Sequence, residues 1–475
     1  MKQLRKNALR LAVVFCGLFV IVSVYTVYLI STNEARLLSS TYNTYAREQR
    51  ARAIRGDILD RHGVVLASSD SEGNRTYSAD PQVRAATVHA VGINSSRMPS
   101  SAEYMFSAYL SGLKLSFPER LSYMLQGQRP RGDNVQLTID SRLAAYAASL
   151  FPAGKSGAVV VMNYKTGEVL TLQSFPNFDP QDAQDVSTAL TWNAATQTLK
   201  APGSTFKIVA AASAIANFPD WAEKTYVCEG VIEFGARSIV DAGTRLAEGT
   251  VTRHGKTTIQ NAFSVSCNNT FAQIALELGD ETLRRTAEAF GFNDNFLFSD
   301  MVVYNSSYPA SNRTEAEIAW TGAGQSGLTA TPLHMCLIAS AVANDGVMME
   351  PRTLMTVTRQ NGGQRAGSSP RVYRRPLTAG QAAALKDCMR EAVLSGTGRS
   401  AAVAGKKVCG KTGSAELDGQ QNTNAWFVGF LDEKNAPYAL AVVVENAGGG
   451  GSVAAPIARD LFTWLIQNES MEETP

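Results

Sequence analysis

The sequence predicts an α+β fold in which a β-sheet is flanked by helices and a large all-helical subdomain is inserted. Apolar residues follow strand patterns at 134–139, 424–430 and 438–444. Helical patterns dominate from 204 to about 344 and return at 454–467. Because strand segments stand on both sides of the long helical stretch, we expect that stretch to be the insertion.

The N-terminal segment predicts a single membrane-spanning helix. Residues 11–30 are 20 residues without a charge, about the length that crosses a hydrocarbon core of roughly 30 Å. The positive-inside rule then predicts a cytoplasmic tail at 1–10, an anchor at 11–30 and an extracytoplasmic remainder. The basic residues of the tail are Lys2, Arg5, Lys6 and Arg10. The alternative is a cleaved signal peptide, whose apolar region is usually shorter, about 7 to 15 residues.

Residues 31–132 predict a stalk followed by a small pedestal or linker region. The stretch 33–52 is polar and charged, and 55–67 has two short apolar pieces around a glycine turn, which predicts a hairpin. From 76 to 132 the pattern is irregular and rich in turn signals. Asp140 then precedes a helical pattern that runs through Leu150. We therefore place the catalytic domain at 133–475.

Composition and charge argue against nucleic-acid and metal-binding classes. The 475 residues are 45% hydrophobic, enough for a large core, and the net charge of +2 gives no strongly basic surface for nucleic acid. The histidines lack metal-ligand spacing, so we expect no metal and no cofactor. They are His62, His89, His254 and His334.

The cysteines predict buried thiols rather than a disulfide framework. Of six cysteines, Cys16 lies in the predicted anchor, and the other five cannot all pair. Apolar neighbours predict that most are small buried hydrophobes. Cys267 has no histidine base near it in the sequence apart from His254, so we interpret it as a packed thiol and not as a nucleophile.

Three short motifs occur in one order along the chain and carry the predicted chemistry. The first motif is Ser204–Lys207 (Ser-Thr-Phe-Lys), the second is Ser266–Asn268 (Ser-Cys-Asn), and the third is Lys411–Gly413 (Lys-Thr-Gly). This S-x-x-K, S-x-N and K-T-G set is known from serine acyltransferases. The order of the three motifs therefore predicts an active-site serine enzyme.

Each motif also has a second copy in the chain, so sequence context must separate them. Ser204 follows an Ala-Pro-Gly turn and precedes an apolar run, which predicts a helix start. The copy at 111–114 has glycine directly after Ser111, and the copy at 31–33 stands where an apolar segment ends. The copy at 165–167 lies between two strand patterns and predicts a hairpin turn.

The first motif predicts a nucleophile and its base. A serine hydroxyl is a poor nucleophile unless a base takes its proton, and Ser204 and Lys207 are three residues apart, so they share one face of a helix. Lys207 must then have a lowered pKa, which burial or a nearby positive charge such as Lys411 can provide. The helix N-terminus adds a positive field that favours an oxyanion beside Ser204.

The other motifs predict proton relay and substrate binding. Ser266 is a candidate relay between the two lysines and the leaving nitrogen. Asn268 offers an amide to a peptide-like substrate, and the hydroxyls of Thr412 and Ser414 are candidates for binding a substrate carboxylate. Gly413 removes a side chain where a ligand must approach the backbone.

These motifs and their flanks resemble class B penicillin-binding proteins over about 133–467. The glycine-containing hairpin at 55–67 resembles the segment that opens the family's pedestal. Further matching segments are 192–207, 264–271, 324–333 and 395–398. Two positions depart from the family pattern: Ser414 stands where many relatives have Thr, and Ala194 where Arg is common.

The resemblance implies a monofunctional peptidoglycan D,D-transpeptidase with the penicillin-binding fold, an antiparallel sheet flanked by helices plus an all-helical subdomain. It implies that Ser204 attacks the D-Ala-D-Ala bond of a stem peptide and that β-lactams trap the same serine. The backbone N–H groups of Ser204 and Ser414 would form the oxyanion hole. It further implies a membrane setting and a polytopic glycan polymerase as a possible partner.

Two alternatives remain open from the sequence. One is hydrolysis, by a D,D-carboxypeptidase or a β-lactamase, because the acylation machinery is shared; Glu416 is a candidate base by proximity only. The other is a non-catalytic β-lactam sensor or divisome scaffold. A sensor needs a cytoplasmic output module, whereas only ten residues precede Leu11.

Overall fold

The computed structural model describes residues 2–32, 48, 53–93, 98–235, 237–245, 248–416 and 423–468. The predicted stalk at 33–52 therefore lies outside the described residues, apart from Glu48. Helix α1 spans Lys2–Thr32, and its stretch Arg5–Thr26 has a mean hydropathy of 2.3. Its length and composition are compatible with a membrane anchor.

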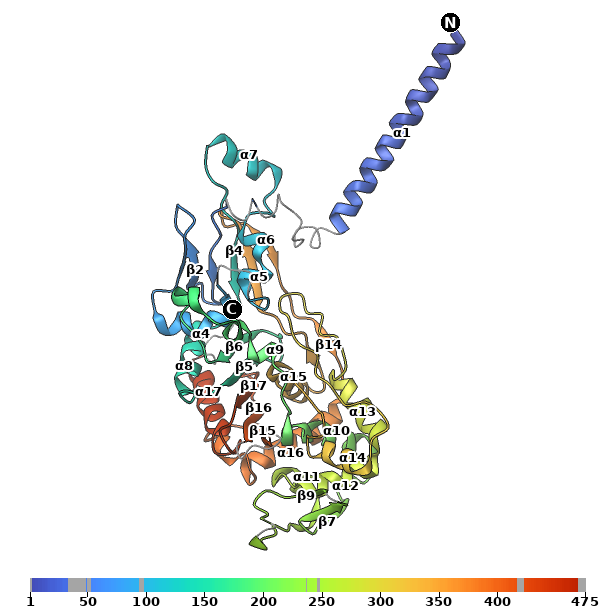
Figure 1. Ribbon diagram of the computed structural model, residues 1–475, viewed down its shortest axis with the longest axis vertical. Coiled ribbons are helices and arrows are strands. Elements are labelled where there is room, and N and C mark those ends of the chain that lie inside the picture. Colours follow the sequence, from blue (N-terminus) through green and yellow to red (C-terminus); the bar gives the residue numbers. More distant parts are fainter. Residues whose placement is uncertain are drawn as a thin grey trace.

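A five-stranded antiparallel sheet forms the centre of the molecule (Figure 1). Its strand order is β15-β16-β17-β5-β6, so strands from the C-terminal part pair with strands that precede the helical stretch. The bounds are β15 Val408–Glu416, β16 Thr423–Leu431, β17 Tyr438–Val444, β5 Gly157–Asn163 and β6 Val169–Phe175. The turn between β5 and β6 contains residues 165–167, which confirms that this third-motif copy is a hairpin turn.

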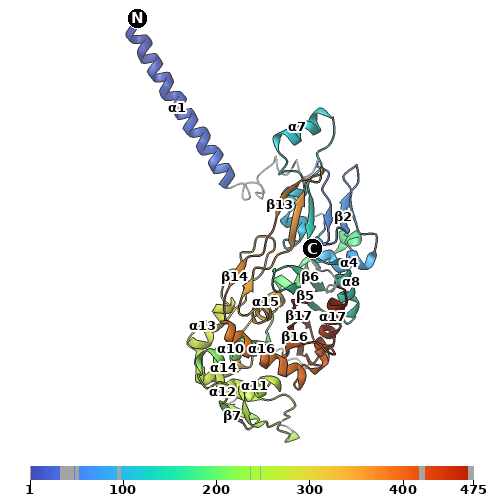
Figure 2. The same cartoon turned by 180° about the vertical axis from the view of Figure 1, so that it is seen from behind.

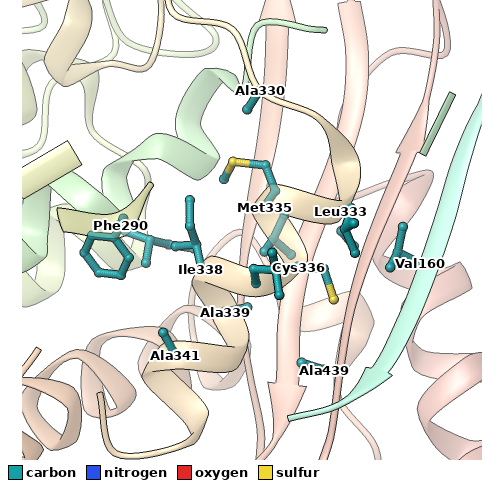
Figure 3. Packing of buried hydrophobic residues seen from close by; sticks show 14 of the residues in the cluster. Val160, Phe290, Ala330, Leu333, Met335, Cys336, Ile338, Ala339, Ala341 and Ala439 are labelled. Carbon is teal, nitrogen blue, oxygen red and sulfur yellow. The ribbon is translucent and has the colours of Figure 1, made fainter. Parts of the chain in front are cut away.

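Strand alternation gives this sheet two apolar faces, each with its own helical layer. On β5, Val159 and Val161 belong to the cluster that packs helices α8 (Ser141–Leu150) and α17 (Ala454–Asn468). Val160 belongs to the opposite cluster, with helix α15 (Pro332–Ala343). Figure 3 shows α15 between the sheet, marked by Val160 and Ala439, and Phe290 of the helical subdomain. The predicted cap of α8 is confirmed, because Asp140 accepts hydrogen bonds from the first backbone N–H groups of that helix.

The helical subdomain lies between β6 and β15 in the chain. Its helices are α9 Ala194–Gln197, α10 Lys207–Asn217, α11 Ile259–Ser264, α12 Asn268–Leu278, α13 Asp280–Phe290, α14 Glu315–Gly322, α15 and α16 Ala379–Leu394. The prediction that helices dominate here was wrong at 225–258, where four short strands form two antiparallel pairs. These strands are β7 Thr225–Cys228, β8 Val231–Phe234, β9 Arg237–Val240 and β10 Gly255–Thr258. Strand β7 pairs with β10, and β8 pairs with β9. Residues with β-branched or aromatic side chains at 225–228 and 231–240 favour strands over helix.

A second sheet forms the pedestal, at the end of the molecule opposite β7 (Figures 1 and 2). The hairpin predicted at 55–67 is confirmed by the antiparallel pairing of β1 and β2. Strand β4, at the predicted start of the catalytic domain, pairs with β1 and β12 in this sheet. The sheet therefore contains strands from before and after residue 132. The six strands, in sheet order, are β13 Gln364–Gly367, β12 Leu354–Thr358, β4 Asn134–Leu137, β1 Ile58–Leu59, β2 Val65–Ser69 and β3 Arg75–Tyr77. A separate two-stranded sheet pairs β11 (Met348–Met349) with β14 (Val372–Arg374).

The pedestal segment that we predicted to be irregular contains short helices. Asp80-Pro81 was interpreted as a turn, but Asp80 caps the helix that Pro81 begins. Proline is common at the first helical position because its missing N–H would have no partner there. The helices are α4 Pro81–Val91, α5 Ala102–Met105, α6 Ser107–Leu110 and α7 Phe117–Leu125.

Candidate active site

The first motif lies on a tight turn that leads into α10. Residues Gly203–Phe206 form a 3₁₀ turn and α10 begins at Lys207, so Ser204 sits one turn before the α-helix and not in its first α-helical turn as predicted. Phe206 is fully buried and makes an edge contact with Phe292, with 5.5 Å between ring centroids. This packing fixes the turn that presents Ser204.

Lys207 meets Ser204 as the spacing predicts, and further acceptors surround its amine. Its Nζ lies 3.1 Å from Ser204 Oγ, 2.7 Å from the backbone oxygen of Ser266 and 2.7 Å from Asn268 Oδ1. The side chain is completely buried. Burial lowers the pKa of Lys207 to about 8, although Cys267 and Asp241 oppose the shift.

These distances suit a neutral amine that acts as a base. A neutral amine has two N–H donors and one lone pair. The two carbonyl oxygens at 2.7 Å take the donors, so the lone pair is left facing Ser204 Oγ at 3.1 Å. In this protonation state the Ser204 hydroxyl donates to Lys207, which is the arrangement that proton removal requires.

The second motif sits at the junction of α11 and α12. The Ser266 N–H donates to the carbonyl of Phe263, and the Cys267 N–H donates to that of Ala262. This pattern is a Schellman motif, which needs a left-handed residue, and Ser266 has φ +61°. This position normally favours glycine, so a serine here strains the backbone. Such strain is typical of residues whose side chain has a functional role. The Ser266 hydroxyl lies 3.3 Å from Lys207 Nζ.

Asn268 holds protein groups at both ends of its amide. Its Oδ1 accepts from Lys207, and its Nδ2 donates to the backbone oxygen of Val240 at 2.9 Å. We predicted that this amide binds substrate. That role stays a prediction. The structure adds contacts that position the base, and these were not visible in the sequence because Val240 is 28 residues away.

Lys411 lies on β15 and is completely buried. Its Nζ donates to the backbone oxygen of Thr412 at 3.0 Å and lies 5.6 Å from the centre of the Phe263 ring. Burial, followed by the charge of Lys207, lowers the pKa of Lys411 well below its ordinary value. Of the two causes that we expected for the lowered pKa of Lys207, burial is the one found here.

The remaining residues of the third motif border the turn that carries the nucleophile. Thr412 Oγ1 lies 2.6 Å from Thr397 Oγ1, and Ser414 Oγ accepts from the N–H of Gly450 at 3.2 Å. A β-carbon on Gly413 would lie 3.0 Å from Thr205 Cγ2 and 3.1 Å from the backbone oxygen of Pro202. Gly413 therefore makes room for the first-motif turn. Its predicted role in letting a ligand approach the backbone stays a prediction.

Two contacting residues had no predicted role. Thr397 belongs to the turn at 395–398 that we noted without assigning chemistry, and Gly450 lies in a glycine run that precedes α17. The extra motif copies stay apart from the site. The Ser111 hydroxyl is buried and donates to the backbone oxygen of Ser107. Residues 31 and 32 are the last two of α1, and Asn33 lies outside the described residues. The side chain of Glu416 lies outside the described residues.

Cys267 is the N-cap of α12, and its neighbours in the structure were not predicted from the sequence. Burial raises the pKa of Cys267 to about 12, which agrees with a packed thiol and not with a nucleophile. Its sulfur lies near Cys228, Asp241 and His254, and all the ligand-type atoms of these four residues are within 4.8 Å of one another. Their separation along the chain concealed this cluster.

Comparison with known proteins gives the same assignment as the geometry. The family model described as the penicillin binding protein transpeptidase domain matches residues 157–463. Peptidoglycan D,D-transpeptidase PbpA of Mycolicibacterium smegmatis is 28% identical over 450 residues, which cover 88% of this chain and 90% of the relative. The PbpA of Mycobacterium tuberculosis is 30% identical over 390 residues, covering 74% of this chain and 76% of the relative.

A solved structure shares the fold over nearly the whole described chain. Penicillin-binding protein A from M. tuberculosis, solved as an imipenem acyl-enzyme complex, matches with a TM-score of 0.77 and 27% identity, over 88% of this chain and 100% of that one. The family match includes the turn of Ser204, the second motif and β15. The chain therefore belongs to the penicillin-binding protein family, as a member of its class B D,D-transpeptidases.

Proposed function

We propose that this chain is a peptidoglycan D,D-transpeptidase that forms its acyl-enzyme on Ser204. The observation that carries the proposal is the buried amine of Lys207. Two carbonyl oxygens hold it, and its nitrogen lies 3.1 Å from Ser204 Oγ, with the lone pair facing that oxygen. A lysine with a pKa near 8 is partly neutral at physiological pH and can take a proton. The named relatives are D,D-transpeptidases, and this supports the same reaction here.

Acylation begins when Ser204 Oγ attacks the carbonyl carbon of the penultimate D-Ala while its proton passes to Lys207 Nζ. The backbone N–H groups of Ser204 and Ser414 stabilise the oxyanion. When the peptide bond breaks, the proton moves through the Ser266 hydroxyl, 3.3 Å from Lys207, to the leaving nitrogen of the terminal D-Ala. Lys411 is also buried, and repulsion between its amine and that of Lys207 disfavours the state in which both are charged.

Deacylation completes the crosslink. The amine of a neighbouring stem peptide attacks the acyl carbon, its proton returns through the same groups to Ser204 Oγ, and an amide bond replaces the ester. Thr412 and Ser414 lie on β15, and their hydroxyls are the proposed binding groups for the donor carboxylate. Asn268 belongs to the site as the residue that positions Lys207.

A β-lactam presents a strained amide to the same serine and forms an ester that deacylates slowly. The solved neighbour is an acyl-enzyme with imipenem, and this supports the same adduct on Ser204 here. Penicillin binding and transpeptidation therefore share one nucleophile in this proposal.

We also propose a location and a partner. Helix α1 would anchor the chain, with the basic residues before Leu11 on the cytoplasmic side and the catalytic domain outside. A polytopic glycan polymerase is the proposed membrane partner, by resemblance to the family. A reporter enzyme active only outside the cytoplasm, fused after Asn468, should be active; an inactive but intact fusion would contradict this orientation.

The function is tested with the full chain in detergent, a stem-peptide donor that ends in D-Ala-D-Ala, and a stem peptide that bears a free amine. Mass spectrometry should find a crosslinked dimer and released D-Ala, and Ser204→Ala should give neither. Hydrolysed donor without dimer, at acceptor concentrations that saturate the rate, would identify a carboxypeptidase instead. Ser111→Ala should still release D-Ala. Release that is lost in Ser204→Ala but kept in Ser111→Ala would identify Ser204, and not the extra motif copy, as the nucleophile.

A further inference from the structure

Four side chains with metal-binding atoms converge next to the second motif, and the proposed reaction uses none of them. Cys228 ends β7, Asp241 follows β9, His254 precedes β10 and Cys267 caps α12. Their ligand-type atoms all lie within 4.8 Å of one another. They come from four different places in the chain, so a bound ion would link the two strand pairs, β7–β10 and β8–β9, to the catalytic helices.

The distances between these atoms are close to those of a tetrahedral zinc site. Asp241 Oδ2 lies 2.9 Å from the sulfur of Cys228, 3.4 Å from that of Cys267 and 3.2 Å from His254 Nδ1. His254 Nδ1 lies 3.5 Å from the sulfur of Cys228. Zinc–sulfur bonds of about 2.3 Å and zinc–nitrogen or zinc–oxygen bonds of about 2.0 Å at tetrahedral angles give ligand separations of roughly 3.3–3.8 Å. One ion can therefore reach all four atoms with small adjustments.

The donor set selects the metal class. Two thiolates, one imidazole and one carboxylate favour zinc over magnesium or calcium, which prefer oxygen ligands. Four protein ligands close the coordination sphere, as in structural and not catalytic zinc sites. Binding releases the thiol protons to solvent and keeps His254 neutral.

The burial of the cluster calls for a cation. Cys228, Asp241 and Cys267 are each no more than 2% exposed, whereas the His254 side chain is 23% exposed and gives a route for metal exchange. Among the described residues, the only ion-pair partner of Asp241 is His254. A buried carboxylate beside two thiols is costly unless a positive charge compensates it.

The surrounding hydrogen bonds are those of a supported metal site and lead directly to the second motif. The N–H and hydroxyl groups of Thr270 both lie 3.2 Å from the sulfur of Cys267. Asp241 Oδ1, the oxygen that faces away from the cluster, accepts from the N–H groups of Asn268 and Asn269. Hydrogen bonds of this kind orient metal ligands and raise affinity.

We propose that Cys228, Asp241, His254 and Cys267 bind one Zn²⁺ ion that fixes the segment from β7 to β10 to the start of α12. Through Cys267 and Asp241 the ion positions Ser266 and Asn268, and so holds the second motif against Lys207. This departs from the absence of a metal that we expected from the histidine spacing. The inference does not depend on the proposed reaction, because metal content is measured without substrate.

The first test is the metal content of the full chain, purified in detergent with a thiol reductant and dialysed after exposure to Zn²⁺. The wild-type chain should hold about one zinc per chain, and Cys228→Ser and His254→Gln should each fall below about a tenth of that. Cys388→Ser is the matched control, because Cys388 is equally buried but lies in α16, away from the cluster. It should keep the full zinc content.

A second test uses Co²⁺ as the probe and does not rely on zinc retention. The wild-type chain should give the visible bands of tetrahedral cobalt and a thiolate-to-cobalt charge-transfer band, and Cys228→Ser should lose about half of the latter. Chelation of the wild-type zinc should slow penicillin acylation about tenfold or more, and added Zn²⁺ should restore it.

Three results would overturn the proposal. One is a reduced wild-type chain that binds no zinc. Another is a Cys228→Ser variant that binds zinc as the wild type does. The third is a metal-free native chain whose Cys228 and Cys267 are joined in a disulfide, found by peptide mass mapping.

Discussion

At the scale of single residues, the site depends on a strained serine and two buried lysines. Ser266 adopts φ +61°, a conformation that costs a non-glycine residue about 1–2 kcal/mol, at the position where its hydroxyl reaches Lys207. The i to i+3 spacing of the first motif was sufficient to predict the contact of Ser204 with Lys207. It could not predict that Asn268 and the backbone of Ser266 orient the amine, since those contacts depend on tertiary packing.

Replacing Ser266 with glycine separates backbone strain from chemistry. Ser266→Gly removes the hydroxyl and relieves the left-handed strain. The free energy of unfolding should therefore rise by about 1 kcal/mol, and the unfolding temperature should rise with it. Penicillin acylation should slow roughly 10²-fold or more, because the hydroxyl is lost. Thermal unfolding and acylation rate are measured on the same preparation. Asn312→Gly is the control, because Asn312 also has positive φ but is exposed, and its acylation rate should not change. Unchanged acylation in Ser266→Gly would remove Ser266 from the reaction.

The lowered pKa of Lys207 gives acylation a defined pH dependence. The neutral amine is the reacting form, and its population rises about tenfold per pH unit below the pKa and levels off above it. Because burial brings the pKa of Lys207 to about 8, the penicillin acylation rate should climb from pH 6 and reach a plateau above pH 8. A rate already constant between pH 6 and 8 would show that Lys207 is not the base.

At the scale of elements, the strands at 424–430 and 438–444 were predictable because their apolar runs are long and buried on both faces. The strands β7–β10 were missed because each has four residues, too few for a clear period, and they lie inside a strongly helical region. The same strands bring Asp241 and Val240 to the second motif, so the part of the fold that was missed contains the part of the site that was missed.

The packing of β15 on the first-motif turn can be tested at Gly413. A β-carbon there would lie 3.0–3.2 Å from Thr205, Pro202 and Trp426, so Gly413→Ala must push the turn away from β15. We expect a loss of about 1–3 kcal/mol in the free energy of unfolding and a slower acylation, about 10²-fold, from the displaced nucleophile. Gly380→Ala is the control, since a β-carbon on that helical glycine meets nothing within 4 Å. Wild-type stability and acylation in Gly413→Ala would contradict this packing.

At the scale of the whole molecule, three distant motifs form one site because the helical subdomain and the central sheet share a packed boundary. The turn before α10 packs on β15, while the junction of α11 and α12 brings Ser266 and Asn268 to Lys207. Motif order predicted the family and the chemistry. The division of the chain at residue 132 stays a prediction, and the pedestal sheet shows why sequence cannot settle it, because β12 and β13 return to that sheet from more than 200 residues later.

The central claim is that Ser204 is the acylated nucleophile, and intact mass after penicillin exposure tests it most directly. The full chain in detergent should gain one penicillin mass that persists for hours and maps to the peptide containing Ser204. Ser204→Ala should gain none, while Ser111→Ala, the same change at the buried motif copy, should label like the wild type. An adduct that survives in Ser204→Ala would contradict the account.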